Sequence, residues 1–254
     1  MNQFSRTQLI LGPEALEKLK NSRVAVFGIG GVGGYAVEAL VRSGLGAIDL
    51  IDNDCFSLTN LNRQLYATHS TIGRYKVDVA EERIREINPD CRVTTWKMFF
   101  LPDTRAQMDF AAYDYVIDAI DTVTGKLALV EAAMAENTPI ICCMGTGNKT
   151  DPTALRVTDI HKTSICPLAR IMRSECRKRG INHLKVVCST EQPTRPLEDP
   201  AIESSSECAG TPGAEKSARR RDIPGSTAFV PAAAGLILAA EVVKDLVREA
   251  IPPR

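Results

Sequence analysis

Short apolar runs alternate with helical patterns along the first half of the chain. Arg23–Phe27 is a short buried strand in this pattern, and glycine-rich residues 28–34 follow it directly. Residues 35–43 then place Ala36 and Leu40 on one side of a helix, and residues 47–52 form a second apolar strand. This order of strand, glycine turn, helix and strand predicts a parallel sheet with a right-handed crossover.

The same alternation continues along the rest of the chain. Residues 73–87 form an amphipathic helix, and residues 113–121 form an apolar strand that ends in two carboxylates, Asp118 and Asp121. The other predicted strands are 92–100, 139–145, 153–163 and 183–191, and the other predicted helices are 124–137 and 167–179. We therefore predict a Rossmann-like, doubly wound α/β fold with a mainly parallel sheet.

The chain shows no clear break into independent domains. We expect one domain over residues 1–254, with a nucleotide-binding half at 1–150 and a substrate-binding and dimer half at 151–254. That second half is a C-terminal elaboration with a long polar loop, at about residues 191–222, which is rich in proline and serine and is expected to be mobile.

An uncharged apolar segment lies close to the C-terminus. Residues 225–240 carry no charge, but they are fewer than the roughly 20 residues that a bilayer requires, and they include Pro231. We predict a buried helix that continues to residue 247 and no integral membrane span. Peripheral membrane contact remains an open alternative.

Composition narrows the compartment and the class of partner. The formal net charge is zero, so any RNA binding must come from local basic patches, and DNA is not an expected partner. None of the eight cysteines forms a C-x-x-C pair, and the N-terminal residues have no apolar leader. We expect a cytoplasmic protein whose cysteines are mostly small core residues.

The glycine turn carries the first functional motif. Gly28, Gly30 and Gly33 follow a strand and open a helix, where backbone N–H groups and the helix N-terminus favour a phosphate. Asp52 ends the next strand, at the spacing where a carboxylate holds a ribose hydroxyl. A nicotinamide cofactor and ATP fit these four residues equally well.

The polar residues that follow Asp52 favour ATP. The chain then carries Asn60, Arg63 and Gln64, and Lys76 opens the next helix. A leaving pyrophosphate is heavily negative, and Arg63 and Lys76 are suited to hold it. Asp121 is a candidate Mg²⁺ ligand at the mouth of its strand, whereas Asp118 is not expected to bind metal.

These residues resemble a known family. The pattern is similar to the adenylation domain of ubiquitin-activating enzymes and of bacterial activators of molybdopterin and thiamine sulfur carriers. The matching residues are Gly28, Gly30, Gly31, Gly33, Asp52, Asp54, Asn60, Arg63, Gln64, Lys76, Asp118 and Asp121. The resemblance implies that Asp52 holds the ribose, that Arg63 and Lys76 hold the phosphates, and that Asp121 holds Mg²⁺. It also implies a homodimer in which Arg6 acts across the interface. A monovalent cation, K⁺ or Na⁺, is a further candidate ligand that no residue pattern places.

The second half resembles one branch of that family, the bacterial tRNA threonylcarbamoyladenosine dehydratases. The segments that carry this similarity are residues 159–173, 185–191 and 225–227. The resemblance implies that a threonyl carboxylate on the adenosine beside the anticodon is adenylated, and that the side chain then cyclises with net loss of water. Cys166 stands where the resemblance leads us to expect an aspartate, and Cys188 where it leads us to expect an aromatic residue. No role is assigned to these two thiols or to Cys208.

A basic helix is the candidate tRNA surface. Arg170, Arg173 and Arg177 share a face by their helical spacing, and Lys178 and Arg179 lie beside it. Phosphate contacts from such a cluster give salt-dependent RNA affinity. Charge alone is equally typical of a solvated helix face, so the family resemblance carries this prediction.

Three other functions remain as alternatives. One is an adenylating activator of a ubiquitin-like sulfur-carrier protein, which the missing zinc cysteines disfavour. Another is a non-catalytic partner in a sulfur relay with a cysteine desulfurase. The third is an NAD-dependent oxidoreductase, which is the least favoured.

Overall fold

A single mixed sheet organises the chain in the computed structural model, which describes residues 1–197 and 224–250. The strand order is β3-β2-β1-β4-β5-β7-β6. The strands are β1 Arg23–Phe27, β2 Ala47–Ile51, β3 Arg92–Trp96, β4 Tyr115–Asp118, β5 Ile140–Cys143, β6 Leu155–Asp159 and β7 Lys185–Ser189. Neighbouring strands are parallel except β6 and β7, which pair antiparallel. The predicted Rossmann-like α/β fold is confirmed, and the elaboration after residue 150 extends the same sheet at one edge.

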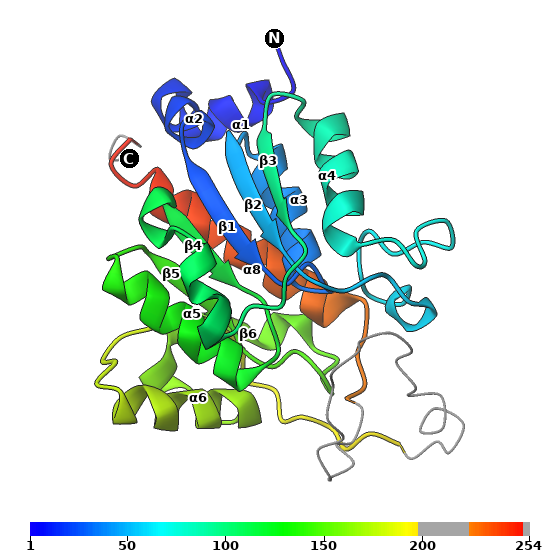
Figure 1. Cartoon of the computed structure of the whole chain (residues 1–254), viewed down its shortest axis with the longest axis vertical. Coiled ribbons are helices and arrows are strands. Elements are labelled where there is room, and N and C mark those ends of the chain that lie inside the picture. The colour runs from blue at the N-terminus through cyan, green and yellow to red at the C-terminus, as the bar shows by residue number, and fades with distance from the viewer. Residues whose placement is uncertain (198–223, 251–254) are drawn as a thin grey trace.

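Helices cover both faces of this sheet (Figure 1). They are α1 Ser5–Leu11, α2 Pro13–Lys20, α3 Gly33–Arg42, α4 Lys76–Ile87, α5 Val123–Ala135, α6 Pro167–Lys178 and α8 Phe229–Leu246. The alternation along β1 shows the two layers. Val24 and Val26 join a core cluster with residues of α2, α3, α4 and α8, whereas Ala25 and Phe27 join one with residues of α5. Because both faces are buried, the central strands are continuous apolar runs.

The observed elements are shorter than several predicted ones. The helix predicted from Gly73 begins at Lys76, because Gly73 adopts a left-handed φ of 83° in the turn that precedes it. The strand predicted over residues 113–121 ends at Asp118, and residues 119–122 form the turn into α5. Helices α1 and α2 were not predicted. Helix α1 has no buried residue, so it lacks the apolar stripe that reveals a helix.

The apolar C-terminal segment is the buried helix α8, as predicted. It packs against α3 so closely that a Cβ on Gly235 would lie 2.2 Å from the carbonyl oxygen of Val32. Among the described helices, none has the length and apolar character to cross a membrane.

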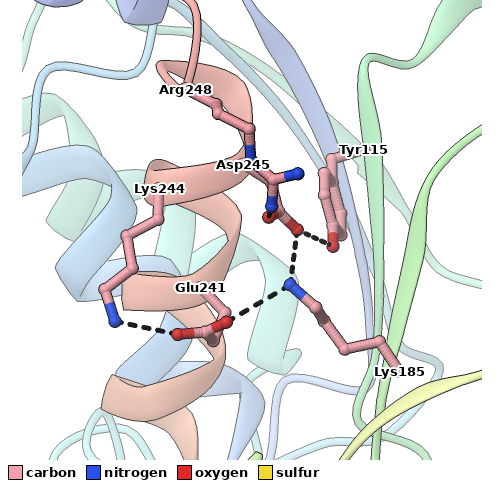
Figure 2. Close-up of polar contacts among 6 residues, drawn as sticks. All are labelled: Tyr115, Lys185, Glu241, Lys244, Asp245 and Arg248. Carbon is pink, nitrogen blue, oxygen red and sulfur yellow. Dashed lines mark hydrogen bonds and ion pairs between the residues drawn. The ribbon is translucent and has the colours of Figure 1, made fainter. Parts of the chain in front are cut away.

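A polar cluster fastens the C-terminal end of α8 to the sheet (Figure 2). Lys185 Nζ donates to Asp245 Oδ2 at 2.8 Å and to Glu241 Oε2 at 3.2 Å. Tyr115 donates its hydroxyl proton to the same oxygen of Asp245 at 2.7 Å. Tyr115 and Lys185 begin β4 and β7, so the cluster lies at the amino edge of the parallel strands.

The described cysteines are unpaired thiols, and most of them are core residues, as predicted. Cys55 is exposed. Those that are buried are Cys91, Cys142, Cys143, Cys166, Cys176 and Cys188. Cys208 and most of the predicted polar loop lie outside the described residues.

Candidate active site

The glycine turn has the tight geometry that its sequence predicts. Gly28 follows β1 with a φ of 88°, and α3 begins at Gly33. A Cβ on Gly33 would lie 1.7 Å from the carbonyl oxygen of Gly28, so only glycine allows the turn to close. Gly30 has open space instead, since its Cβ would meet only Gln64 Nε2, at 3.8 Å. The exposed backbone of Gly30 can therefore approach a bound phosphate.

Asp52 is held against this turn. One carboxylate oxygen accepts the N–H of Ile29 at 2.7 Å, and the other accepts the N–H of Asp54 at 2.9 Å. Burial raises the pKa of Asp52 above its ordinary value, although the charge of Lys76 and the two N–H donors oppose this effect. The predicted ribose ligand is thus anchored by backbone in the orientation that faces the glycine turn.

Lys76 joins the site from the first residue of α4. Its side chain is 7% exposed, and its Nζ donates to Asp54 Oδ2 at 2.8 Å and lies 3.9 Å from Asp52 Oδ2. The structure therefore brings the glycine turn, both aspartates and the lysine together, because β1 and β2 are parallel and end at the same edge.

The segment after β2 lies over the glycine turn. Asn60 shapes its own turn by accepting the N–H of Ser57 at 3.1 Å, rather than projecting into the site. Arg63 Cγ lies 3.4 Å from where a Cβ on Gly31 would be, and burial lowers the pKa of its guanidinium. Arg63 Nη1 donates to Thr59 and Asn62 oxygens, both at 2.9 Å.

Gln64 carries an unused acceptor in this segment. Gln64 is 8% exposed, and its Oε1 has no hydrogen-bond partner among the described residues. A buried polar atom without a partner is costly, so this amide is suited to accept a hydrogen bond from a ligand.

Asp118 ends β4, Asp121 lies in the turn that follows, and the two aspartates have opposite surroundings. Asp121 is exposed and makes no hydrogen bond or ion pair with the described residues. Asp118 is fully buried and bonded to Lys126, which agrees with its exclusion as a metal ligand. Lys126 is a site-adjacent residue that the sequence reasoning missed. Its signal was a lysine on the buried side of helix 123–135, whose other charged residue is Glu131.

Arg6 is not brought to this site within the chain. It is exposed on α1, and its neighbour Phe4 lies 3.6 Å from where a Cβ on Gly44 would be, just before β2. Asp52 lies at the other end of β2, about 16 Å away at 3.3 Å per residue. Within one chain, therefore, Arg6 lies far from the glycine turn and Asp52.

The predicted tRNA-binding residues divide into two groups on α6. Arg170 and Arg177 are exposed, and their side chains make no hydrogen bond or ion pair with the described part of the chain. Arg173 is half-buried and donates to the carbonyl and hydroxyl oxygens of Thr163, at 2.7 and 2.6 Å. Lys178 and Arg179 are paired with acidic side chains, Glu175 for both and Glu131 for Arg179.

The chain is similar in sequence and in structure to known proteins. The sequence profile of the ThiF family matches residues 3–253. The chain is 45% identical to the tRNA threonylcarbamoyladenosine dehydratase of Bacillus subtilis over 250 residues, which are 98% of this chain and 96% of that protein. It is 38% identical to the Escherichia coli enzyme of the same name over 98% of this chain and 94% of that protein. The crystal structure of the E. coli enzyme in complex with ATP superimposes with a TM-score of 0.83 at 35% identity, covering 98% and 95% of the two chains.

Proposed function

The chain belongs to the ThiF family, and from this premise we propose that it is an ATP-dependent tRNA threonylcarbamoyladenosine dehydratase. Relatives that span almost the whole chain carry that name. The observation that carries the proposal is the close approach of Asp52, Lys76 and the glycine turn, since the E. coli relative of the same fold binds ATP and AMP.

The reaction follows from adenylation chemistry. The threonyl carboxylate attacks the α-phosphorus of ATP, and pyrophosphate leaves with the electrons of the broken P–O bond. An atom of the ureido group then attacks the acyl carbon and loses its proton, while AMP leaves with one former carboxylate oxygen. The tRNA therefore loses one water in total. The nucleophile is tethered to the acyl group at a high effective concentration, so this closure requires no enzyme thiol.

Each pocket residue has a role in the first step. Asp52 binds the ribose hydroxyls, and the backbone of the glycine turn binds phosphate oxygens. Lys76 and Arg63 neutralise the charge that builds on the departing pyrophosphate. The free Oε1 of Gln64 supports a direct contact with the nucleotide. Asp54 holds Lys76 ready, and Asn60 shapes the segment that carries Arg63.

Asp121 is the proposed Mg²⁺ ligand. It is an exposed carboxylate without a described partner, at the carboxyl end of β4 and next to the glycine turn. The described residues contain no cluster of three or more side chains placed to bind a metal ion. This fits Mg²⁺, which is commonly held by one or two carboxylates together with substrate phosphates. No described residue set points to a K⁺ or Na⁺ site.

We also propose a homodimer in which Arg6 of each copy completes the other copy's site, because the fold holds Arg6 away from its own. The exposed basic residues of α6 would contact tRNA phosphates, and the reaction is placed in the cytoplasm. No described contact favours the sulfur-carrier alternative, and a desulfurase partner is a separate proposal that the described surface does not specify.

The test uses purified protein, ATP, Mg²⁺ and tRNA that bears threonylcarbamoyladenosine. Mass spectrometry of the digested nucleosides should show loss of one water, with AMP and pyrophosphate formed in equal amounts. Omission of ATP, or substitution Asp121→Ala, should leave the nucleoside unchanged. A threonylcarbamoyladenosine of unchanged mass, together with pyrophosphate exchange stimulated by a small carrier protein, would instead identify a sulfur-carrier activator.

A further inference from the structure

Lys126 and Asp118 form the only described ion pair in which both side chains have 0% exposure. Asp118 borders the turn that carries Asp121, the proposed Mg²⁺ ligand. Lys126 Nζ donates to both carboxylate oxygens of Asp118, at 3.0 Å each, and to the carbonyl oxygen of Cys143 at 2.7 Å. The ammonium group therefore uses all three of its protons. Burial acts to lower the pKa of Lys126, but Asp118 and the neighbouring cysteines outweigh it, so the pKa is raised and the group is charged.

Holding α5 in place does not require this pair. The helix already buries a series of apolar residues against the sheet: Leu127, Ala128, Leu129, Val130, Ala132 and Ala133. Removing two charges from water is expensive, and replacing such a pair with apolar residues of similar volume is often neutral or stabilising. A buried pair of this kind is better explained by the single arrangement that it imposes on its surroundings.

On one side, the ion pair contacts the turn that carries Asp121. Asp118 Oδ1 also accepts the N–H of Ile120 at 3.2 Å, so the carboxylate that binds Lys126 closes the first part of the turn. Ala119 N–H donates to the carbonyl oxygen of Phe27 at 2.8 Å, and this bond ties the turn to the end of β1. Asp121 itself has no described bond, so its place depends on these neighbours.

On the other side, the ion pair contacts the end of β5. The carbonyl oxygen of Cys143 is the last one of that strand. The chain leaves the sheet after Met144, whose N–H still donates to the carbonyl oxygen of Val187 at 2.8 Å. Residues 145–149 lead into residues 151–254, the half that we expect to bind substrate. Asn148 also contacts that half, because the N–H of Gly225 donates to Asn148 Oδ1 at 2.6 Å. One ammonium group, that of Lys126, thus joins the turn of the proposed metal ligand to residues 145–149, which we call the substrate-side loop.

We propose that Lys126 is a positioning residue that, through Asp118 and Cys143, fixes Asp121 relative to the substrate-side loop for transfer to the α-phosphate. The inference rests on the proposed function. Lys126 touches neither nucleotide nor substrate, and its effect is exerted through the geometry of the 119–122 turn.

The test replaces the pair with two neutral combinations, Asp118→Asn/Lys126→Met and Asp118→Leu/Lys126→Met. The second serves if the first fails to unfold cooperatively, because an apolar pair avoids any buried charge. Pyrophosphate exchange and nucleoside conversion are measured against Mg²⁺ and ATP concentration. We expect cooperative unfolding, a kcat about 100-fold lower, and a roughly tenfold higher Mg²⁺ concentration for half-maximal rate, with KM for ATP changed less than kcat.

The control removes a partly exposed lysine–aspartate pair at the opposite edge of the sheet, with Lys185→Met/Asp245→Asn. It should keep the wild-type kcat and Mg²⁺ dependence. A folded neutral variant of the 118/126 pair with wild-type kcat and Mg²⁺ dependence overturns the positioning role. Absence of turnover in the wild-type protein overturns the proposed function instead, so the two failures are distinguishable.

Discussion

Lys76 is bonded to Asp54 at 2.8 Å while it lies 3.9 Å from Asp52, so its ammonium group is shared between an outer and an inner carboxylate. The Asp54 side chain is 59% exposed and that of Asp52 is 9% exposed. We expect a bound phosphate to replace Asp54 as the partner of Lys76 and to leave Asp52 in place. We interpret the outer pair as the resting state of a phosphate-binding lysine.

Substitution Lys76→Met should lower kcat/KM for ATP by about 100- to 1000-fold, the usual effect of removing one donor to developing charge. Steady-state pyrophosphate exchange measures it. Lys97→Met is a suitable control, because Lys97 is an exposed lysine that pairs with Asp78 of α4, the helix that Lys76 begins. Equal losses in both variants would contradict a specific role for Lys76.

Two glycines of the same turn should separate folding from binding. Gly30→Ala meets open space, so the protein should keep its stability to within about 0.5 kcal/mol while ATP affinity falls at least about tenfold. Gly33→Ala forces a Cβ against the Gly28 carbonyl and should cost about 1–3 kcal/mol of unfolding free energy as well. Thermal unfolding and ATP titration test both, and unchanged ATP affinity for Gly30→Ala would remove that backbone from the phosphate site.

The exposed pair on α6 predicts how tRNA binding responds to salt. Arg170→Ala/Arg177→Ala should leave the unfolding temperature unchanged and reduce the slope of log affinity against log salt by about 1.5. Lys178→Ala/Arg179→Ala should have a smaller effect, because these side chains already pair with Glu175 and Glu131. Filter binding across a salt series measures the slopes. The same slope in wild type and in the first variant would place tRNA on another surface.

The sequence predicts the strands around the glycine turn well because their cues are local. Gly28 and Asp52 each directly follow a strand that is recognisable from its own apolar run, and Gly33 opens the helix after the turn. Parallel strands bring such ends together. Lys76 is predictable for a similar reason, since it opens the helix that follows.

Other features depend on contacts that no local pattern contains. Lys126 reads as a stray charge in an apolar helix until the fold places Asp118 and Cys143 around it. The antiparallel direction of β6 depends on its pairing with β7, which follows it after α6. The opposite fates of Arg170 and Lys178 depend on where Glu175 and Glu131 lie. Spacing alone places Arg170, Arg173 and Arg177 on one face, and it does not show that Arg173 is bonded to Thr163.

Mixed dimers test the proposed exchange of Arg6. Arg6→Ala and Asp121→Ala should each be inactive alone. If each site uses Arg6 from the second copy, random mixing restores one intact site in about half of the dimers, and activity returns to about a quarter of wild type. Subunits are mixed by co-refolding and assayed by nucleoside conversion. No recovery would show that Arg6 and Asp121 do not act in this arrangement.

The cluster at the end of α8 predicts a pH-dependent part of the stability (Figure 2). Burial acts to raise the pKa of Asp245, but Lys185 and Tyr115 outweigh it, and hydrogen bonds from Lys244 and Lys185 lower the pKa of Glu241. Carboxyl groups with lowered folded pKa values stabilise the protein above their unfolded pKa, about 4, and lose that contribution as the pH falls through the folded values.

Lys185→Met should therefore cost about 1–2 kcal/mol of unfolding free energy at pH 7, between the ranges for exposed and buried pairs. The difference from wild type should shrink below about pH 4. Urea unfolding across pH measures this, with Lys244→Ala as an exposed control worth about 0.5 kcal/mol or less. A constant difference between Lys185→Met and wild type down to pH 3 would mean that ionised Glu241 and Asp245 are not the source of the stability that Lys185 provides.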